Sequence, residues 1–231
     1  MNSSLSSGTI PSAFKQARIT PLLKKPTLNP AQVENYRPVS LLPFLSKTPE
    51  RAVAKQVTNF LNQNGQLDPK QSGFRSGQIE TALLSVTEAL RTARAEGLSS
   101  VLILLDLSAA FDTVNHKILL RILTSMGITG AVHSWFNSYL TGQSFKVSWQ
   151  GKLSSNYTLT TGVPQGSVLG PLLFAMYTTS LGHVIRTHGL SYHCYADDTQ
   201  MYLSFQPDDS TVSARISACL ADPLTRITTY S

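Results

Sequence analysis

Apolar and polar residues recur along the chain with two different periods, which together predict a mixture of helices and strands. In the segments expected to be helical, apolar residues return every three or four positions and a glycine ends the pattern. The expected helices cover residues 48–65, 79–96, 116–126 and 129–140, and a further apolar helix follows residue 171. Strands are expected in other segments, where apolar residues alternate with polar ones or form a short continuous run.

The strand period is seen in short apolar or alternating runs. The expected strands are residues 101–105, 145–149, 157–161, 190–195 and 200–205. The first is a continuous apolar run, typical of a strand covered on both faces, and it ends at Asp106. The second and third form a hairpin around Gly151, and the last two flank a turn that holds Asp197 and Asp198. The pattern therefore predicts an α+β fold in which strand ends carry acids.

Length and composition place the chain among globular proteins. It has 231 residues, of which 42% are hydrophobic, enough for one large or two small compact domains with a buried core. Its apolar runs are far shorter than the roughly 20 residues that cross a bilayer, and no signal-peptide pattern opens the chain. Cys194 and Cys219 lie outside any metal-ligand spacing and are expected to be buried. These features predict an intracellular protein without a membrane span.

The positive charge is concentrated in the first part of the chain. The formal net charge is +6, and residues 1–100 carry twelve Lys and Arg against six Asp and Glu, whereas residues 101–231 carry seven of each. The basic part is therefore the candidate surface for a polyanion such as nucleic acid. Every acid after Glu96 is an aspartate, the short carboxylate favoured in turns and metal sites.

Three aspartates at strand ends are the candidate chemistry of the sequence. If the strands that carry Asp106, Asp197 and Asp198 are neighbours in one sheet, their like charges repel unless a cation binds among them. Clustered carboxylates suit Mg²⁺, and a pair of such ions about 3.5–4 Å apart supports in-line phosphoryl transfer. The structural alternatives are a polar hairpin turn for Asp197 and Asp198 and a strand-end cap for Asp106.

Five segments match the motifs of one enzyme family in order and spacing. Leu104–Thr113, Gly162–Phe174 and Tyr195–Asp198 contain the aspartates and a Pro-Gln-Gly loop, and Asn35–Ser40 and Gln71–Arg75 precede them. In these segments the sequence resembles the reverse transcriptase of LINE-type (non-LTR) retrotransposons, close to the jockey-like mobile elements. The agreement of five ordered motifs argues against chance.

The resemblance covers about residues 5–221 and implies an α+β fold with a right-hand polymerase palm. The palm is expected to be an antiparallel sheet backed by helices, with partial fingers and with the thumb absent. The expected division is 1–97 for the partial fingers and the fingers–palm helices, 98–222 for the palm with its catalytic motifs, and 223–231 for a divergent tail.

The resemblance also implies roles for the acids. Asp106, Asp197 and Asp198 are expected to be catalytic and to bind two Mg²⁺ ions, with Mn²⁺ as a substitute. Asp106 and Asp197 correspond to the metal ligands of the palm, and Asp198 corresponds to the supporting acid of the turn. Adjacent strand residues point to opposite faces, so Asp197 and Asp198 need not be equivalent.

Nucleotide-binding roles are implied for Lys24, Arg37, Phe111, Gln165 and Gly166. Lys24 and Arg37 correspond to cations that clamp the triphosphate, a role suited to a mobile ammonium and a bidentate guanidinium. Phe111 corresponds to the ring beneath the incoming sugar that excludes a 2′-hydroxyl; the alternative is a core aromatic. Gln165 corresponds to the residue that steadies the nucleotide and the templating base, and Gly166 allows close backbone approach. The alternative for Gln165 is a buried loop amide.

Template contacts are expected from Lys70 and Arg75. Lys25 could take the role of Lys24, and the sequence does not separate the two. Without the resemblance, such cations usually belong to a solvated face. Gln143 stands where relatives carry Arg, which removes an expected phosphate contact.

The implied function is that of an RNA-directed DNA polymerase in the nucleus. It would transfer nucleotides from dNTPs to the 3′ end of a DNA primer on an RNA template. The alternative is a catalytically silent remnant that binds RNA or an RNA:DNA hybrid through its net charge of +6. A third reading is an unselected gene fragment that folds poorly because the palm sheet lacks its covering C-terminal segment, for which a broad melt would be the sign.

Overall fold

The chain folds into two compact units, each built from two separate stretches of sequence. The computed structural model describes the backbone of residues 2–73, 79–106, 111–164 and 166–229, and their side chains except at residues 2, 79–82, 106 and 223–229. Unit 1 comprises Met1–Gln63 and Phe111–Leu173, and unit 2 comprises Asn64–Ala110 and Phe174–Ser231. These units cut across the linear division expected at residue 98, because strands distant in sequence pair within each unit.

The helices of unit 1 follow the amphipathic pattern of the sequence. They are α1 (Asn2–Ser7), α2 (Lys47–Gln63), α4 (His116–Ser125) and α5 (Gly130–Leu140), with 3₁₀ turns at Ser12–Phe14, Val33–Asn35 and Phe44–Ser46. The Asn115 side chain begins α4, because it accepts hydrogen bonds from the N–H groups of Lys117 and Ile118. In α5 the buried rings of Trp135 and Tyr139 stack with centroids 5.6 Å apart. The three long helices confirm the predicted segments to within two residues at each end.

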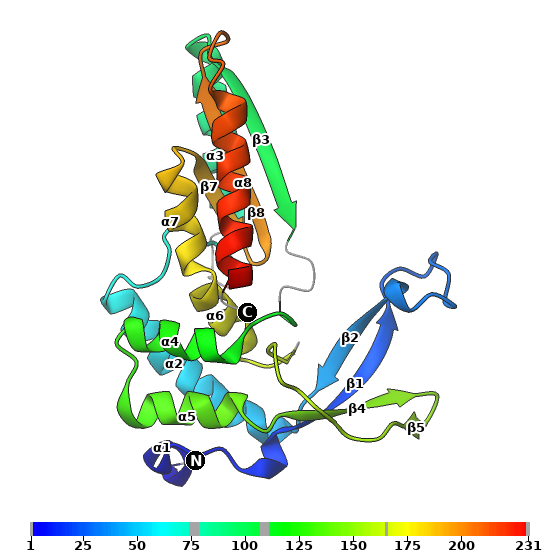
Figure 1. The fold of residues 1–231 in the computed structure, drawn as a ribbon. Helices are drawn as coiled ribbons and strands as arrows, with labels where there is room; N and C mark the ends of the chain where they lie inside the picture. Colours follow the sequence, from blue (N-terminus) through cyan, green and yellow to red (C-terminus); the bar gives the residue numbers. More distant parts are fainter. Residues whose placement is uncertain (1, 74–78, 107–110, 165, 230–231) are drawn as a thin grey trace. The chain divides into compact units, whose positions relative to one another are not determined.

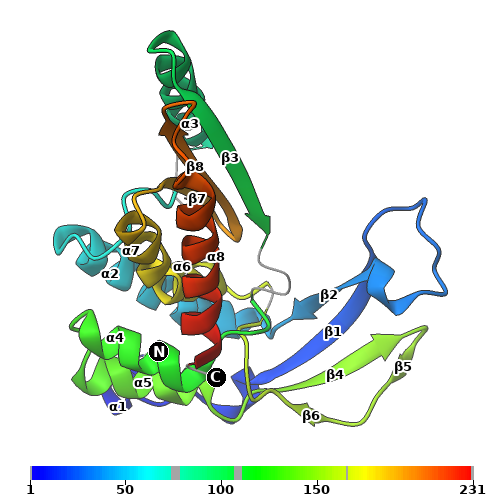
Figure 2. The same cartoon turned by 45° about the horizontal axis from the view of Figure 1, so that its top comes forward.

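The sheet of unit 1 contains strands that the sequence pattern did not predict. Its strands are β1 (Gln16–Leu23), β2 (Tyr36–Leu41), β4 (Ser144–Trp149), β5 (Lys152–Leu153) and β6 (Tyr157–Thr158). The order is β2-β1-β4-β5, with β6 also paired to β4 (Figure 2). β1 is antiparallel to β2 and parallel to β4.

The hairpin predicted around Gly151 forms with an interruption. β5 pairs with the end of β4, where Ser148 lies opposite Leu153, and β6 pairs with its start, where Ser144 lies opposite Thr158. The expected strand at 157–161 is only Tyr157–Thr158, because Thr158 lies opposite Ser144, the first residue of β4, and the chain then runs past the start of that strand.

Unit 2 contains an antiparallel sheet with the order β3-β8-β7. Its elements are α3 (Ile79–Ala95), β3 (Ser99–Asp106), α7 (Thr179–Thr187), β7 (Ser191–Tyr195), β8 (Asp198–Phe205) and α8 (Val212–Thr229), and α6 (Gly170–Tyr177) enters it from unit 1. The apolar side chains of α7 and α8 form one cluster with β7 and β8. The helix α3 also lies along this sheet (Figure 1). Cys194 and Cys219 are buried in that cluster, as predicted. This unit confirms the expected antiparallel sheet backed by helices.

Among the described residues, no helix combines the length and the apolar character that a membrane span requires.

Candidate active site

The acidic strand ends lie at one edge of the unit 2 sheet. β3 and β8 are neighbours, and their register places the Cα atom of Asp106 opposite that of Asp198. Asp197 lies in the two-residue turn that joins β7 to β8. Asp197 is half-buried and Asp198 is exposed, whereas the side chain of Asp106 lies outside the described residues. The strands that carry the acids are thus neighbours, as the metal hypothesis requires.

The donor set at this edge suits a hard cation. Carboxylate oxygens are the ligands that Mg²⁺ prefers. Within the described part of the chain, the only ion pair joins His188 to Asp222, so neither Asp197 nor Asp198 is neutralised by Lys or Arg there. No group of three potential metal ligands occurs among the described side chains, a set that does not include the side chain of Asp106.

The turn between β7 and β8 has an unusual backbone. Ala196 adopts a φ of +56°, a left-handed conformation that costs a non-glycine residue about 1–2 kcal/mol. The Gln71 side chain contacts the turn: its Oε1 accepts the N–H of Ala196 at 3.0 Å, and its Nε2 donates to the carbonyl of Ala196 at 3.2 Å. The same Oε1 accepts the N–H of Gly73 at 2.9 Å. Sequence reasoning missed Gln71 as a partner of the turn, because no local pattern connects positions so far apart.

Side-chain hydrogen bonds also hold residues 68–73 against β7. Asp68 accepts a hydrogen bond of 2.6 Å from the Tyr192 hydroxyl, and burial raises the pKa of that phenol. Ser72 Oγ lies 2.7 Å from His193 Nε2, and both side chains are buried. Burial, aided by the charge of Lys70 and partly opposed by Asp68, lowers the pKa of His193. This shift favours the neutral form of the imidazole.

In unit 1, the segment that begins at Phe111 is joined to the Pro-Gln-Gly loop. The N–H groups of Gly162 and Val163 donate to the carbonyls of Val114 and Phe111, each at 2.8 Å. His116 Nε2 donates to the carbonyl of Gly162 at 2.7 Å. A Cβ atom at Gly162, whose φ is +84°, would lie 2.8 Å from the backbone of Asp112. Only glycine fits this crossing of two motifs.

Glu50 anchors the other end of the same loop. Its Oε2 accepts hydrogen bonds from the N–H groups of Val168 at 2.8 Å and Leu169 at 3.2 Å, and from the Tyr139 hydroxyl at 3.3 Å. Burial raises the pKa of the carboxyl, and these hydrogen bonds and the Lys47 charge oppose that rise. The sequence offered a signal that we missed, since Glu50 lies on the buried stripe of α2.

The expected nucleotide-binding residues that the structure describes all belong to unit 1. Lys24 and Arg37 are exposed, near the turn that joins β1 to β2, where Lys24 N–H donates to the Asn35 carbonyl at 2.8 Å. Phe111 is half-buried. Gly166 has a φ of +102°, and a Cβ atom there would lie 2.9 Å from the Ser40 carbonyl oxygen.

The remaining predicted contacts divide between the described and the undescribed residues. Lys70 is exposed in unit 2, and its carbonyl accepts the N–H of Cys194 at 2.9 Å. Gln165 and Arg75 lie outside the described residues. The roles of all these side chains stay predictions.

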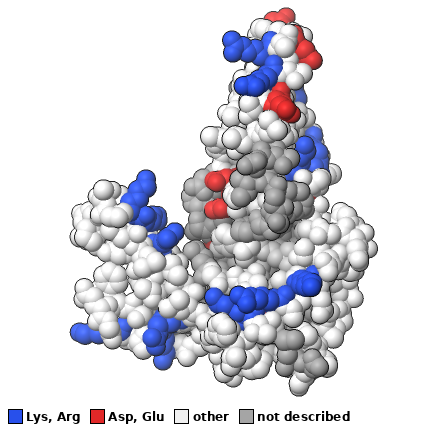
Figure 3. Space-filling view, turned by 180° about the vertical axis from the view of Figure 1, so that it is seen from behind, with Lys and Arg blue, Asp and Glu red and all other residues white. Residues whose placement is uncertain are grey.

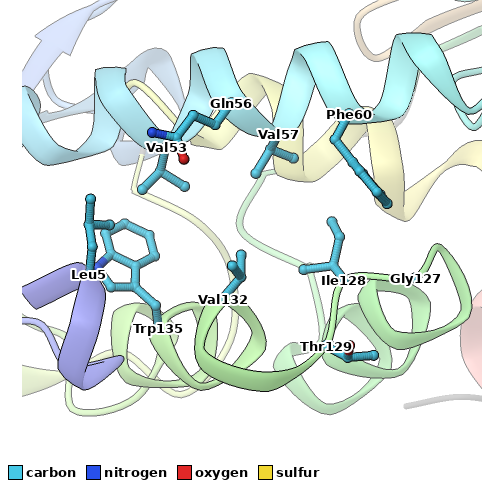
Figure 4. Close-up of a pocket in the computed structure, with 10 residues that line it drawn as sticks. All are labelled: Leu5, Val53, Gln56, Val57, Phe60, Gly127, Ile128, Thr129, Val132 and Trp135. Carbon is cyan, nitrogen blue, oxygen red and sulfur yellow. The ribbon is translucent and has the colours of Figure 1, made fainter.

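A cavity of about 350 Å³ lies in unit 1 between α2 and α5 (Figure 4). Val53 and Val57 of α2 face Val132 and Trp135 of α5 across it, and Leu5 closes one end. Its lining holds no acid, base or thiol, so this cavity offers no catalytic group.

The two units differ sharply in charge. Unit 1 carries twelve Lys and Arg against three Asp and Glu, a net of +9, whereas unit 2 carries seven against ten, a net of −3. On the face drawn in Figure 3, the blue side chains over the unit 1 part have almost no red among them. The difference in net charge is thus larger between the two units than between the two parts of the sequence. Unit 1 is therefore the candidate surface for a polyanion.

Known proteins resemble this chain over nearly its whole length. The sequence model of the family described as "Reverse transcriptase (RNA-dependent DNA polymerase)" matches residues 23–227. A probable RNA-directed DNA polymerase from transposon X-element of Drosophila melanogaster is 34% identical over 161 residues, covering 69% of this chain and 18% of that protein. The RNA-directed DNA polymerase from mobile element jockey of Drosophila funebris is 30% identical over 234 residues, covering 99% of this chain and 24% of that protein.

A solved structure shares the fold. Apo telomerase from Candida tropicalis, truncated from its C-terminal domain, superposes with a TM-score of 0.65 at 12% identity, covering 95% of this chain and 49% of that one. At this identity the likeness shows the fold alone. The chain spans about a fifth to a quarter of the length of the relatives that it matches in sequence.

Proposed function

Because the chain belongs to the reverse transcriptase (RNA-dependent DNA polymerase) family, we propose that it is the nucleotidyl-transfer part of an RNA-directed DNA polymerase. It would extend the 3′ end of a DNA primer on an RNA template. The observation that carries the proposal is the register of β3 and β8, in which Asp106 lies opposite Asp198 and next to the turn that contains Asp197. Carboxylates brought together at one edge of a sheet suit a divalent cation.

The family uses divalent metal ions, which when bound activate the attacking hydroxyl and neutralise the transferred phosphate. In our proposal Asp106 and Asp197 hold two Mg²⁺ ions, and Asp198 supports them with its negative charge. The carboxylates repel one another without a cation, so the turn is poised to bind one.

Unit 1 would bind the incoming dNTP. Lys24 and Arg37 donate hydrogen bonds to the triphosphate oxygens, and the Phe111 ring excludes a 2′-hydroxyl from the sugar. Gln165 steadies the nucleotide and the templating base, and Gly166 allows close backbone approach. Both cations are exposed on a unit with a net charge of +9, which supports a role with a polyanion.

Single-nucleotide extension of a primed RNA template tests the proposal. With Mg²⁺ the chain is expected to add one nucleotide, and EDTA is expected to abolish the addition. Asp197→Asn should lower the rate by about a hundredfold or more, since loss of even a hydrogen-bonding partner of a metal ligand costs about 10- to 100-fold. Asp208→Asn is the matched control, because Asp208 is an exposed aspartate after β8, outside the acidic edge.

Two outcomes would contradict the proposal. In one, the chain melts cooperatively and binds the hybrid but adds no nucleotide, which favours a binding remnant. In the other, Asp197→Asn and Asp208→Asn extend the primer equally well.

A further inference from the structure

The stretch of chain from Lys70 to Gly73 lies along the edge of β7, next to the acidic turn. The Cys194 N–H donates to the Lys70 carbonyl, and the Ser72 N–H donates to the Cys194 carbonyl, both at 2.9 Å. Gln71 and Cys194 therefore form a parallel bridge. This bridge joins the stretch to the edge of the sheet and brings Gln71 to the turn.

The Gln71 carboxamide is matched to the backbone of Ala196. It accepts from the N–H and donates to the carbonyl of the same residue, and Gln71 is 6% exposed. The bond from Gly73 N–H to Oε1 fixes the orientation of the amide. A Cβ atom at Gly73 would lie 2.2 Å from the Ala196 nitrogen, so the two backbones are in direct contact.

We propose that Gln71 is a positioning residue that holds the Ala196–Asp197 turn in its left-handed conformation, and thereby fixes the carboxylates that bind the metal ions. This inference rests on the proposed function for its catalytic consequence. The sequence led us to expect template contacts from Lys70 and Arg75, on either side of this stretch, and assigned no role to Gln71.

The energetics of the turn explain why it needs such a partner. An alanine with a φ of +56° returns to the extended or helical regions unless its neighbours prevent it. Rotation of that residue would redirect Asp197, which follows it directly, relative to Asp198 on β8. Two hydrogen bonds to both polar atoms of Ala196 oppose that rotation.

Hydrogen exchange of the metal-free protein tests the contact itself. In Gln71→Ala the Ala196 amide should exchange about tenfold faster or more, because a buried hydrogen bond is removed. The Cys194 amide, which donates to the Lys70 carbonyl, should stay protected. Gln71→Met keeps the volume and removes both hydrogen bonds, so it gives the same readout if the alanine variant does not fold.

Titration of Mn²⁺, followed by its electron paramagnetic resonance signal without substrate, tests the effect on the acids. Gln71→Ala should weaken Mn²⁺ binding about tenfold or more. Ser72→Ala is the matched control: Ser72 lies in the same stretch and is also buried, but its hydroxyl faces His193. That variant should bind Mn²⁺ like the wild type.

Extension assays complete the test. In Gln71→Ala the Mg²⁺ concentration for half-maximal rate should rise about tenfold while the KM for template stays unchanged. A higher template KM with unchanged Mg²⁺ dependence would overturn the proposal, as would an unchanged Ala196 exchange rate or equal loss of protection at Cys194 and Ala196. Because exchange and Mn²⁺ binding need no turnover, an inactive wild type would contradict the proposed function without deciding this inference.

Discussion

The Glu50 carboxylate binds backbone donors where a helix begins. The N–H groups of Val168 and Leu169 directly precede α6, a position at which helix donors have no partner of their own. A buried carboxylate there satisfies them and holds the Pro-Gln-Gly loop to α2. The charge is tolerated because three hydrogen bonds compensate for its lost hydration.

Substitutions of Glu50 separate these two effects. Glu50→Ala removes the acceptor of the Val168 and Leu169 N–H groups and of the Tyr139 hydroxyl, and should lower the free energy of unfolding by about 1–3 kcal/mol. Burial raises the pKa of this carboxyl from its ordinary value near 4.5, so the folded state holds the proton more tightly than the unfolded state. Stability from this group therefore falls as pH rises above about 4.5.

Glu50→Gln should remove that dependence, so its stability relative to the wild type should be higher at pH 7 than at pH 4.5. Urea unfolding at both pH values measures the difference, with Glu34→Gln as an exposed control in the same unit. A relative stability that falls between pH 4.5 and pH 7 would contradict the assigned direction.

At the scale of elements, the loop from Gly162 to Gly170 is held at both ends. Gly162 and Val163 pair with the stretch that begins at Phe111, and Glu50 holds the residues before α6. Elements distant in sequence thus fix a loop that contains two expected nucleotide-binding residues.

Substitution of Gly162 tests the importance of that attachment. Gly162→Ala places a Cβ atom 2.8 Å from the Asp112 backbone, whereas Gly142→Ala, at a similar φ of +70°, meets no atom within 4 Å. Gly142→Ala should cost about 1–2 kcal/mol of backbone strain. Gly162→Ala should cost at least about 1 kcal/mol more, from overpacking. Equal urea midpoints for the two variants would refute the close contact.

Amphipathic periods predicted α2, α3, α4 and α5, and apolar or alternating runs predicted the β3, β7 and β8 strands, whereas α7 and α8 were not predicted. β1 and β2 were not predicted, because each contains a proline, Pro21 in β1 and Pro38 in β2, and proline in a sequence argues against a strand. For the site, the aspartates could be predicted from their positions at strand ends. Gln71 could not, because the fold alone brings it to Ala196.

At the scale of the whole molecule, unit 1 carries a net charge of +9. Arg18 and Lys146 lie directly opposite each other on β1 and β4, an arrangement that repels. In the described part of the chain neither forms an ion pair with an acid. A bound polyanion would relieve this repulsion.

The double variant Arg18→Gln, Lys146→Gln should therefore bind an RNA:DNA hybrid more weakly. The slope of log K against log salt concentration should fall by about 1 for each phosphate that the protein no longer neutralises. Arg91→Gln, Arg94→Gln removes two exposed charges from α3 of the acidic unit and should leave both quantities unchanged. Equal effects in the two double variants would show that the charge of unit 1 has no special role.

The pairing of β3 with β8 also governs when the fold can form during synthesis. Ser99 pairs with Phe205, so β3 leaves the ribosome about a hundred residues before its partner. At roughly 5–20 residues per second, this strand waits about 5–20 seconds with both edges unpaired. Until then its exposed edges can pair with other chains, so a nascent chain that stalls in this interval is exposed to aggregation. The acidic edge is therefore assembled late, and a ribosome-bound chain lacks the proposed metal site until β8 has emerged.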